Sequence, residues 1–186
     1  MQWKHYAAAA VLALSLVPAA AGAFDYNMSV DEVSEHPLTA YNTVYLAMPK
    51  ADFARNFAVL PDWTFYASDG TSEKAERTTT DGKATIIEGL SITTANGTPQ
   101  GKTIAFENYF KSNDRKIARK IARKMYDRLA ATIYSNMEDF PYSQSDDEIT
   151  WVQNDVTIVT SFNGRKDADG YYTVTLRRYN NHVLKA

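Results

Sequence analysis

Dipeptides that favour tight turns divide the middle of the chain at regular intervals. They are Asp69-Gly70, Asp81-Gly82 and Asn96-Gly97, and the stretches between them are rich in Thr, Ile, Phe and Tyr. Aspartate, asparagine and glycine tolerate the positive φ angles of hairpin turns. The spacing therefore predicts an antiparallel meander with strands over residues 63–68, 71–80, 83–94 and 102–110. Residues 73–80 are nearly all polar, which indicates either an edge strand or a loop.

A second meander is predicted near the end of the chain. ITWVQ (149–153), VTIVTSF (156–162) and YYTVTLRRY (171–179) have the composition of strands. Alternate residues of the second and third segments share one face, as in strands that cover a core. A short strand is also expected over residues 43–47.

One helix is predicted before each of these meanders. The longer one covers residues 112–137, with Ser112, Asn113 or Asp114 as its N-cap. A short helix lies within residues 48–63, where Phe53 and Phe57 are four residues apart and are expected to anchor the core. We therefore expect an α+β fold: an antiparallel β-meander sheet, or two such sheets, packed against one long amphipathic helix, with a short N-terminal helix.

Residues 1–23 have the three parts of a secretory signal. Lys4 and His5 precede an apolar run over residues 7–17, and Ala21-Gly22-Ala23 is an A-x-A cleavage site. We expect an irregular lead-in over residues 24–42, a single domain over 43–180 and a C-terminal tail over 181–186. No later segment approaches ~20 consecutive apolar residues. The expected location is thus periplasmic or secreted.

The composition excludes several kinds of chemistry. The chain has no cysteine, so disulfides and thiolate metal sites are excluded. Without Lys4 it has 19 Lys and Arg against 22 Asp and Glu, which does not favour a nucleic-acid binder. After signal removal only His36 and His182 remain, and no H-E-x-x-H or G-x-S-x-G motif occurs. We expect neither an enzyme nor a cofactor or metal ion.

Two acidic stretches resemble cation sites only in part. The loop Asp167-Ala-Asp-Gly170 shares residues with an EF-hand, but Arg165 would occupy its first ligand position and Leu176 its last. A hairpin turn is the better interpretation. The acidic run Glu138, Asp139, Asp146, Asp147 and Glu148 is expected to be a solvated loop beside a basic helix rather than a divalent-cation site.

The predicted long helix contains RKIARKIARKMYDR, with a basic face opposite an apolar stripe. The stripe begins at Ile117, Ala118, Ile121, Ala122 and Met125, and drifts to Leu129, Ile133, Tyr134 and Met137. The basic residues repel one another at i, i+4, and we expect no acidic partner for them within the helix. Something negative should therefore lie nearby, either the acidic run or an external anion. The candidate anion- or partner-binding residues are Arg115, Lys116, Arg119, Lys120, Arg123 and Lys124.

The sequence favours a non-catalytic binding or interaction module of the cell envelope. One alternative is an electrostatic binder of anionic lipid, cell-wall polymer or acidic protein through the basic helix face. The other is a small carboxylate-dependent hydrolase, since two of the acids can meet in a fold. A partner is expected to be an envelope protein or an anionic envelope component. For the basic face itself, a face that is solvated or neutralised by the chain's own acidic run is favoured over one that binds an external anion.

The signal sequence generates a first prediction. Expression in an export-competent bacterium should yield a product whose N-terminus lies at or within a few residues of Phe24, because the A-x-A site is cleaved during export. Intact-mass spectrometry checks this. A product that retains Met1 and stays with the membrane would contradict the predicted location.

Overall fold

The computed structural model describes residues 39–40, 44–137, 140–153 and 155–182. The predicted signal (1–23) and most of the predicted lead-in lie outside the described residues. His36, Glu138 and Asp139 lie outside them too. Within the described part of the chain, no helix is both long and apolar enough to cross a lipid bilayer.

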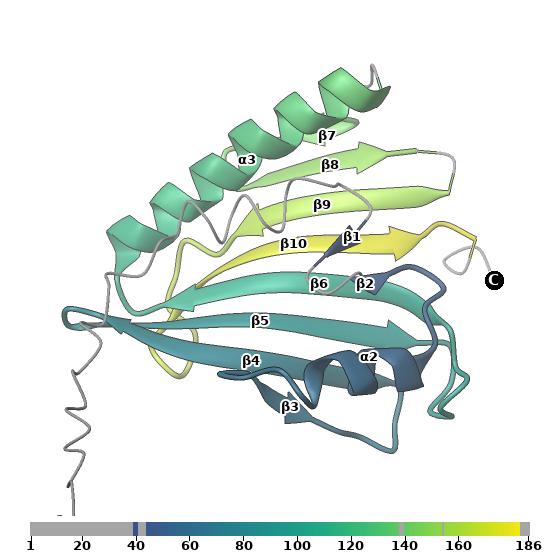
Figure 1. Cartoon of the computed structure of the whole chain (residues 1–186). Coiled ribbons are helices and arrows are strands. Elements are labelled where there is room, and N and C mark those ends of the chain that lie inside the picture. Colours follow the sequence, from purple (N-terminus) through teal and green to yellow (C-terminus); the bar gives the residue numbers. More distant parts are fainter. Residues whose placement is uncertain (1–38, 41–43, 138–139, 154, 183–186) are drawn as a thin grey trace, which may run out of the picture.

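Among the described residues, the main element is an antiparallel sheet of eight strands in the order β3-β4-β5-β6-β10-β9-β8-β7 (Figure 1). The first predicted meander supplies β3 to β6 and the second supplies β8 to β10, and these two sets join at the centre of the sheet. The outermost strand β7 was not predicted. The predicted α+β class with an antiparallel sheet is thus confirmed, and both meanders belong to one sheet. The strands are β3 (Thr64–Tyr66), β4 (Ser72–Asp81), β5 (Ala84–Thr94), β6 (Thr103–Ser112), β7 (Ser143–Gln144), β8 (Glu148–Val152), β9 (Val156–Phe162) and β10 (Tyr172–Asn180).

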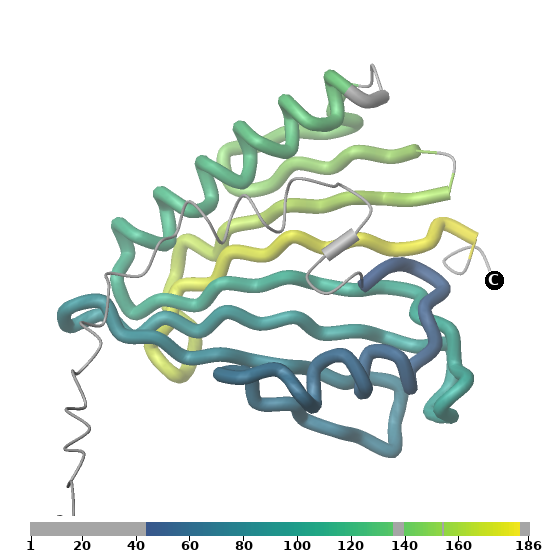
Figure 2. Tube along the Cα trace, in the orientation of Figure 1, coloured from purple at the N-terminus to yellow at the C-terminus, as the bar shows by residue number. Residues whose placement is uncertain are grey.

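The two meanders join through antiparallel pairing of β6 with β10. The register runs from Tyr172 opposite Ser112 to Tyr179 opposite Ala105. It places Val174 beside Phe110, and both side chains are buried in the core. The chain therefore leaves the middle of the sheet at the end of β6. It returns there as strand β10, which lies next to β6 (Figure 2).

The polar stretch 73–80 is part of β4, so its interpretation as a loop is wrong. β4 pairs with β5 over ten residues but with β3 over only three, so most of β4 has one neighbouring strand among the described residues. Threonine favours extended backbone, and the alternate residues Glu73 and Ala75 face the core. Gly82 has a φ of 60° in the two-residue connection to β5, as the turn signal predicts.

The short helix α2 (Lys50–Phe57) lies within the stretch where the sequence predicts one. Phe53 and Phe57 are fully buried, and their ring centroids are 4.8 Å apart. The Trp63 ring packs edge-on against Phe57 at 5.3 Å. The pair of phenylalanines thus anchors α2 to the core, as their spacing predicts.

The long helix α3 (Arg115–Met137) begins after Asp114. Asp114 Oδ1 accepts hydrogen bonds from the backbone N–H groups of Lys116 and Ile117 at 2.8 and 3.1 Å, which identifies Asp114 as the N-cap. α3 contacts β10, β9 and β6. The residues of its apolar stripe that are fully buried are Ala118, Ile121, Met125, Leu129 and Ile133.

The predicted stripe is wrong at its C-terminal end. Tyr134 is 42% exposed and packs against the Phe140 ring instead of the sheet. A four-residue step advances 400°, so the buried row turns about 40° at each step and passes from Leu129 to Ile133, leaving Tyr134 beside it. The side chain of Met137 lies outside the described residues.

Both helices cover the same face of the sheet, and their apolar residues belong to one core cluster (Figure 1).

On the opposite face, where the described residues include no helix, the Tyr109 ring lies directly over Gly89. A Cβ atom at position 89 would come within 1.9 Å of that ring, so any other residue would displace the Tyr109 side chain. Tyr109 donates a hydrogen bond to Glu76 at 2.5 Å, and burial, followed by this bond, raises the pKa of Tyr109.

Ordered structure extends past both predicted domain bounds. Strand β1 (Thr39–Ala40), in the predicted irregular lead-in, pairs with β2 (Val44–Tyr45). At the other end, Asn181 lies in the predicted C-terminal tail. Its side chain is buried and donates a hydrogen bond to the carbonyl of Gln153 at 2.6 Å.

The packing of α3 generates a second prediction. Ile121→Asp should lower the free energy of unfolding by more than about 4 kcal/mol, because it places a carboxylate in the core without a partner. Lys120→Asp should change it by less than about 0.5 kcal/mol, since position 120 is exposed. Urea unfolding followed by circular dichroism measures both. Equal effects at the two positions would mean that α3 does not pack as described.

Candidate functional site

The six predicted partner-binding residues lie on α3 in two parallel columns. Five of them are exposed and Lys124 is half-buried. At 100° per residue, the two columns point in directions about 100° apart. The arginine column faces β8 and β9, because two of its members line a cleft there, whereas no lysine of the other column does so. The first column, which we call the arginine column, is Arg115, Arg119 and Arg123. The second column, which we call the lysine row, is Lys116, Lys120 and Lys124.

The cleft has a volume of about 420 Å³ and lies between α3 and the strands β7, β8 and β9. One wall comes from α3, the other from the β7–β8 turn, and the floor from β8 and β9. The lining residues are Arg119, Ala122, Arg123, Tyr126, Gln144, Ser145, Asp146, Asp147, Glu148, Ile149, Thr160, Ser161 and Phe162.

Aromatic rings support the arginines of the helical wall. The guanidinium carbon of Arg119 lies 5.9 Å from the centroid of Phe162, and that of Arg123 lies 5.2 Å from the centroid of Tyr126. Such contacts orient a cation without neutralising it. Arg123 also pairs with Asp127 at 3.1 Å, so the expectation that the basic residues have no acidic partner within the helix is wrong for Arg123.

The opposite wall is the acidic turn, residues 146–148. Ser145 Oγ accepts a hydrogen bond from the backbone N–H of Glu148 at 3.0 Å, which closes the turn. Gln144 donates to the hydroxyl of Tyr126 at 3.0 Å and so links the hairpin to α3. This hydrogen bond thus connects the strand before the acidic turn to the helix that carries the arginines.

The two walls carry opposite charges but are not joined by an ion pair. Among the described residues, no carboxylate of the acidic turn lies within 4.0 Å of the guanidinium nitrogens of Arg119 or Arg123. All of these side chains are exposed, so solvent weakens their mutual attraction. The walls can therefore each bind a ligand group of opposite charge. Internal neutralisation of the basic face by the acidic run stays a prediction.

The other sequence signals lie elsewhere in the fold. Asp167 Oδ1 accepts backbone hydrogen bonds from Asp169 and Tyr171 at 3.1 and 2.8 Å, and Gly170 has a φ of 86°. These contacts confirm a turn at residues 167–170. Across the described ranges, no three His, Asp or Glu side chains are grouped closely enough to hold a metal ion.

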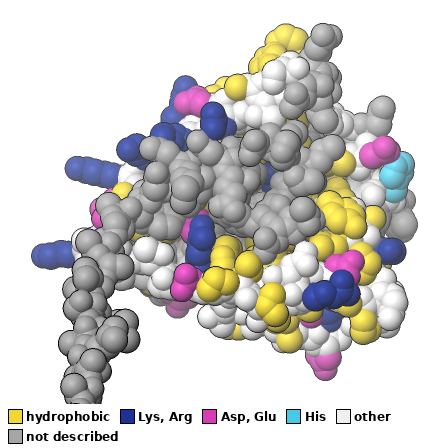
Figure 3. Space-filling model, viewed as in Figure 1, with side chains coloured by type: hydrophobic (Ala, Val, Ile, Leu, Met, Phe, Trp, Pro, Cys, Tyr) yellow, Lys and Arg dark blue, Asp and Glu magenta, His cyan; other side chains and the backbone are white. Residues whose placement is uncertain are grey.

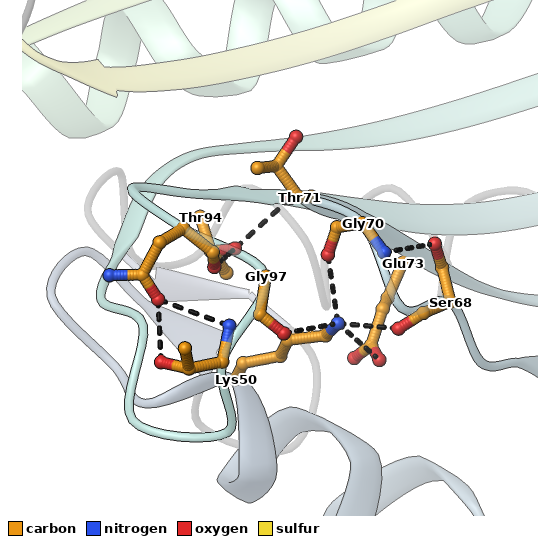
Figure 4. A network of polar contacts seen from close by, with 9 residues as sticks. Lys50, Ser68, Gly70, Thr71, Glu73, Thr94 and Gly97 are labelled. Carbon is orange, nitrogen blue, oxygen red and sulfur yellow. Dashed lines mark hydrogen bonds and ion pairs between the residues drawn. The ribbon is translucent and has the colours of Figure 1, made fainter.

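A buried lysine links α2 to two loops, and the sequence analysis missed it. Lys50 is 5% exposed, and its Nζ donates to the carbonyls of Ser68, Gly70 and Gly97 at 2.5, 2.9 and 3.2 Å (Figure 4). Glu73 Oε1 lies 3.4 Å from the same nitrogen. Four acceptors thus surround the ammonium group, so each of its three N–H donors has a partner within the chain. We assign this cluster to stability.

Arg178 is a second buried cation that sequence reasoning missed. It is 0% exposed, donates to Asn108 Oδ1 at 2.8 Å, and lies 5.1 Å from the Phe106 ring centroid. Burial lowers the pKa of Arg178 to about 9, because the core disfavours the charged guanidinium. Alternation along β10 shows that position 178 faces the core, but it does not identify the partner, which lies 70 residues away.

Comparison of the chain with family models, with curated proteins and with solved structures gives no match. A function for the cleft must therefore be argued from its own residues.

The Lys50 cluster generates a third prediction. Lys50→Met should lower the free energy of unfolding by about 3–5 kcal/mol, because it leaves the buried Glu73 carboxylate unpaired. Adding Glu73→Leu should recover part of that loss, since the unpaired charge is then removed. Chemical denaturation of the wild type, both single variants and the double variant measures the coupling. Strictly additive losses would contradict the pairing.

Proposed function

We propose that the protein is an exported, non-catalytic binding module of the cell envelope, and that its ligand occupies the cleft between α3 and the acidic turn. The observation that supports this proposal is the pair of oppositely charged walls without an ion pair between them. Folding alone gains little from holding exposed charges apart in this way. A ligand with charges of both signs would complete both walls.

The dimensions and lining of the cleft favour a polypeptide segment as that ligand. A volume of about 420 Å³ is in the range of small-ligand sites and admits a few side chains. Arg119 and Arg123 would bind an acidic side chain, and the acidic turn a basic one. The hydroxyl of Thr160 already donates to the carbonyl of Thr175 at 3.1 Å, so toward a ligand it would accept a hydrogen bond from a backbone N–H. We therefore expect a partner protein with a mixed-charge segment.

The same geometry favours binding over hydrolysis. A carboxylic acid that donates a proton in catalysis is normally shielded from water, which keeps it protonated near neutral pH. The three carboxylates of the acidic turn are exposed, and no histidine lines the cleft. Their position on a surface turn suits electrostatic recognition.

A fourth prediction tests the cleft with short peptides. In two-dimensional NMR, a peptide that alternates lysine and glutamate should shift the backbone resonances of Arg119, Tyr126 and Phe162. Peptides of the same length containing only lysine or only glutamate should shift them less, because each satisfies one wall and is repelled by the other. The Arg119→Gln/Arg123→Gln variant should weaken binding of the mixed peptide by at least about tenfold.

A matched control uses the neighbouring column. Lys116→Gln/Lys120→Gln removes the same charge from the same helix but lies outside the cleft, so it should leave peptide binding nearly unchanged. If both double variants weaken binding equally, the effect comes from the general charge of α3 and the cleft proposal is wrong. Absence of any shift in the cleft with all three peptides would also refute it.

A further inference from the structure

The lysine row has no function in the cleft and no ionic partner among the described residues. Lys116 and Lys120 are exposed and Lys124 is half-buried, and no described carboxylate lies within 4.0 Å of their ammonium groups. Like charges four residues apart repel one another along a helix. Cations in the first turns also oppose the helix dipole. The row therefore opposes helix formation, and no ion pair with the described residues offsets that cost.

An exposed aromatic group lies at the other end of the helix. Phe140 and Tyr142 are 74% and 78% exposed, and the Tyr134 ring packs edge-on against Phe140 at 5.1 Å. We call Tyr134, Phe140 and Tyr142 the aromatic tip. Large aromatic side chains with this exposure gain free energy when an apolar or interfacial layer covers them.

Tyr134 of the aromatic tip leaves α3 in the direction from which the lysine row starts, and the row then turns about 40° at each four-residue step. Tyr134 follows Lys116 by 18 residues, which is about five helical turns, so the two side chains leave the helix in the same direction. They are separated by about 27 Å along the axis. In Figure 3, Lys and Arg atoms gather over the N-terminal half of α3 and hydrophobic atoms at its C-terminal end.

We propose that α3 docks on the surface of an anionic lipid bilayer. The lysine row contacts anionic headgroups, and the aromatic tip enters the interfacial region. A cationic surface alone would equally suit an anionic polymer. The aromatic tip favours the bilayer, because aromatic side chains concentrate at the boundary between headgroups and hydrocarbon.

This docking is independent of the ligand in the cleft. The arginine column points toward β8 and β9, so a bilayer against the lysine row leaves the cleft lined as before. The molecule can then hold a polypeptide partner at a membrane surface. Failure of either proposal leaves the other standing.

The fifth prediction is tested with the mature chain and vesicles. Co-sedimentation should show binding to phosphatidylcholine vesicles that contain phosphatidylglycerol and little binding to phosphatidylcholine alone. Binding should fall steeply with salt, because headgroup attraction is screened. Lys116→Gln/Lys120→Gln/Lys124→Gln should weaken it by about 100-fold, since each lysine near an anionic surface contributes roughly a factor of five.

A matched control changes the same charge on other surfaces. Lys83→Gln/Lys102→Gln/Arg165→Gln alters three exposed cations away from α3 and should reduce vesicle binding far less. Phe140→Ser/Tyr142→Ser should weaken binding to anionic vesicles without weakening binding to soluble polyphosphate. All of the changed side chains are exposed or half-buried, so each variant should fold, and circular dichroism checks this.

Three results would overturn the docking proposal. The first is equal binding to neutral and anionic vesicles, or binding to neither. The second is an equal loss in the α3 triple variant and the control triple variant. The third is vesicle binding that is unaffected by the aromatic variant, which would identify the partner as any polyanion instead of a bilayer.

Discussion

The pairing of β6 with β10 is the interaction on which the rest of the structure depends. Each meander is locally determined by its turns, but only this contact makes them one sheet with one core. Because β6 ends at the centre and β7 begins at the far edge, the connection must cross half of the sheet. A helix of 23 residues, about 35 Å long, makes that crossing. The position of α3, and with it the cleft, follows from the central pairing.

Local signals in the sequence account for most of the elements. The hairpin dipeptides, the alternation in β9 and β10, and the N-cap at Asp114 each act over a few residues, so they can be recognised without a structure. Contacts between distant residues give no such signal. Lys50 meets the carbonyl of Gly97 across 47 positions, and Arg178 meets Asn108 across 70. The cleft has the same origin, because it forms where the β7–β8 turn and strand β9 lie beside α3.

The four-residue repeat KIAR, at residues 116–119 and 120–123, contributes side chains to more than one surface of α3. Its isoleucines and alanines pack on the sheet, whereas its arginines and lysines leave the helix in two separate directions. The carboxylate of Asp114 at the helix start offsets part of the conflict between these cations and the helix dipole. Among the described residues, Arg123 is the one cation of the repeat that has an ion pair within the helix. The remaining cations are oriented by the same packing that positions Ile121 and Met125, so the core determines which surface each charge serves.

The sheet ends in very short strands on both sides, three residues in β3 and two in β7. An edge strand exposes unpaired N–H and C=O groups, which can recruit a strand from another molecule and start fibril growth. Here each outer strand offers too few such groups to hold a foreign strand in register. The part of β4 that extends past β3 ends at Asp81, whose charge opposes the close approach of another strand, whereas Arg77 in the same part pairs with Glu88 of β5. The edges of this wide, threonine-rich sheet thus oppose the pairing with foreign strands that its composition would favour.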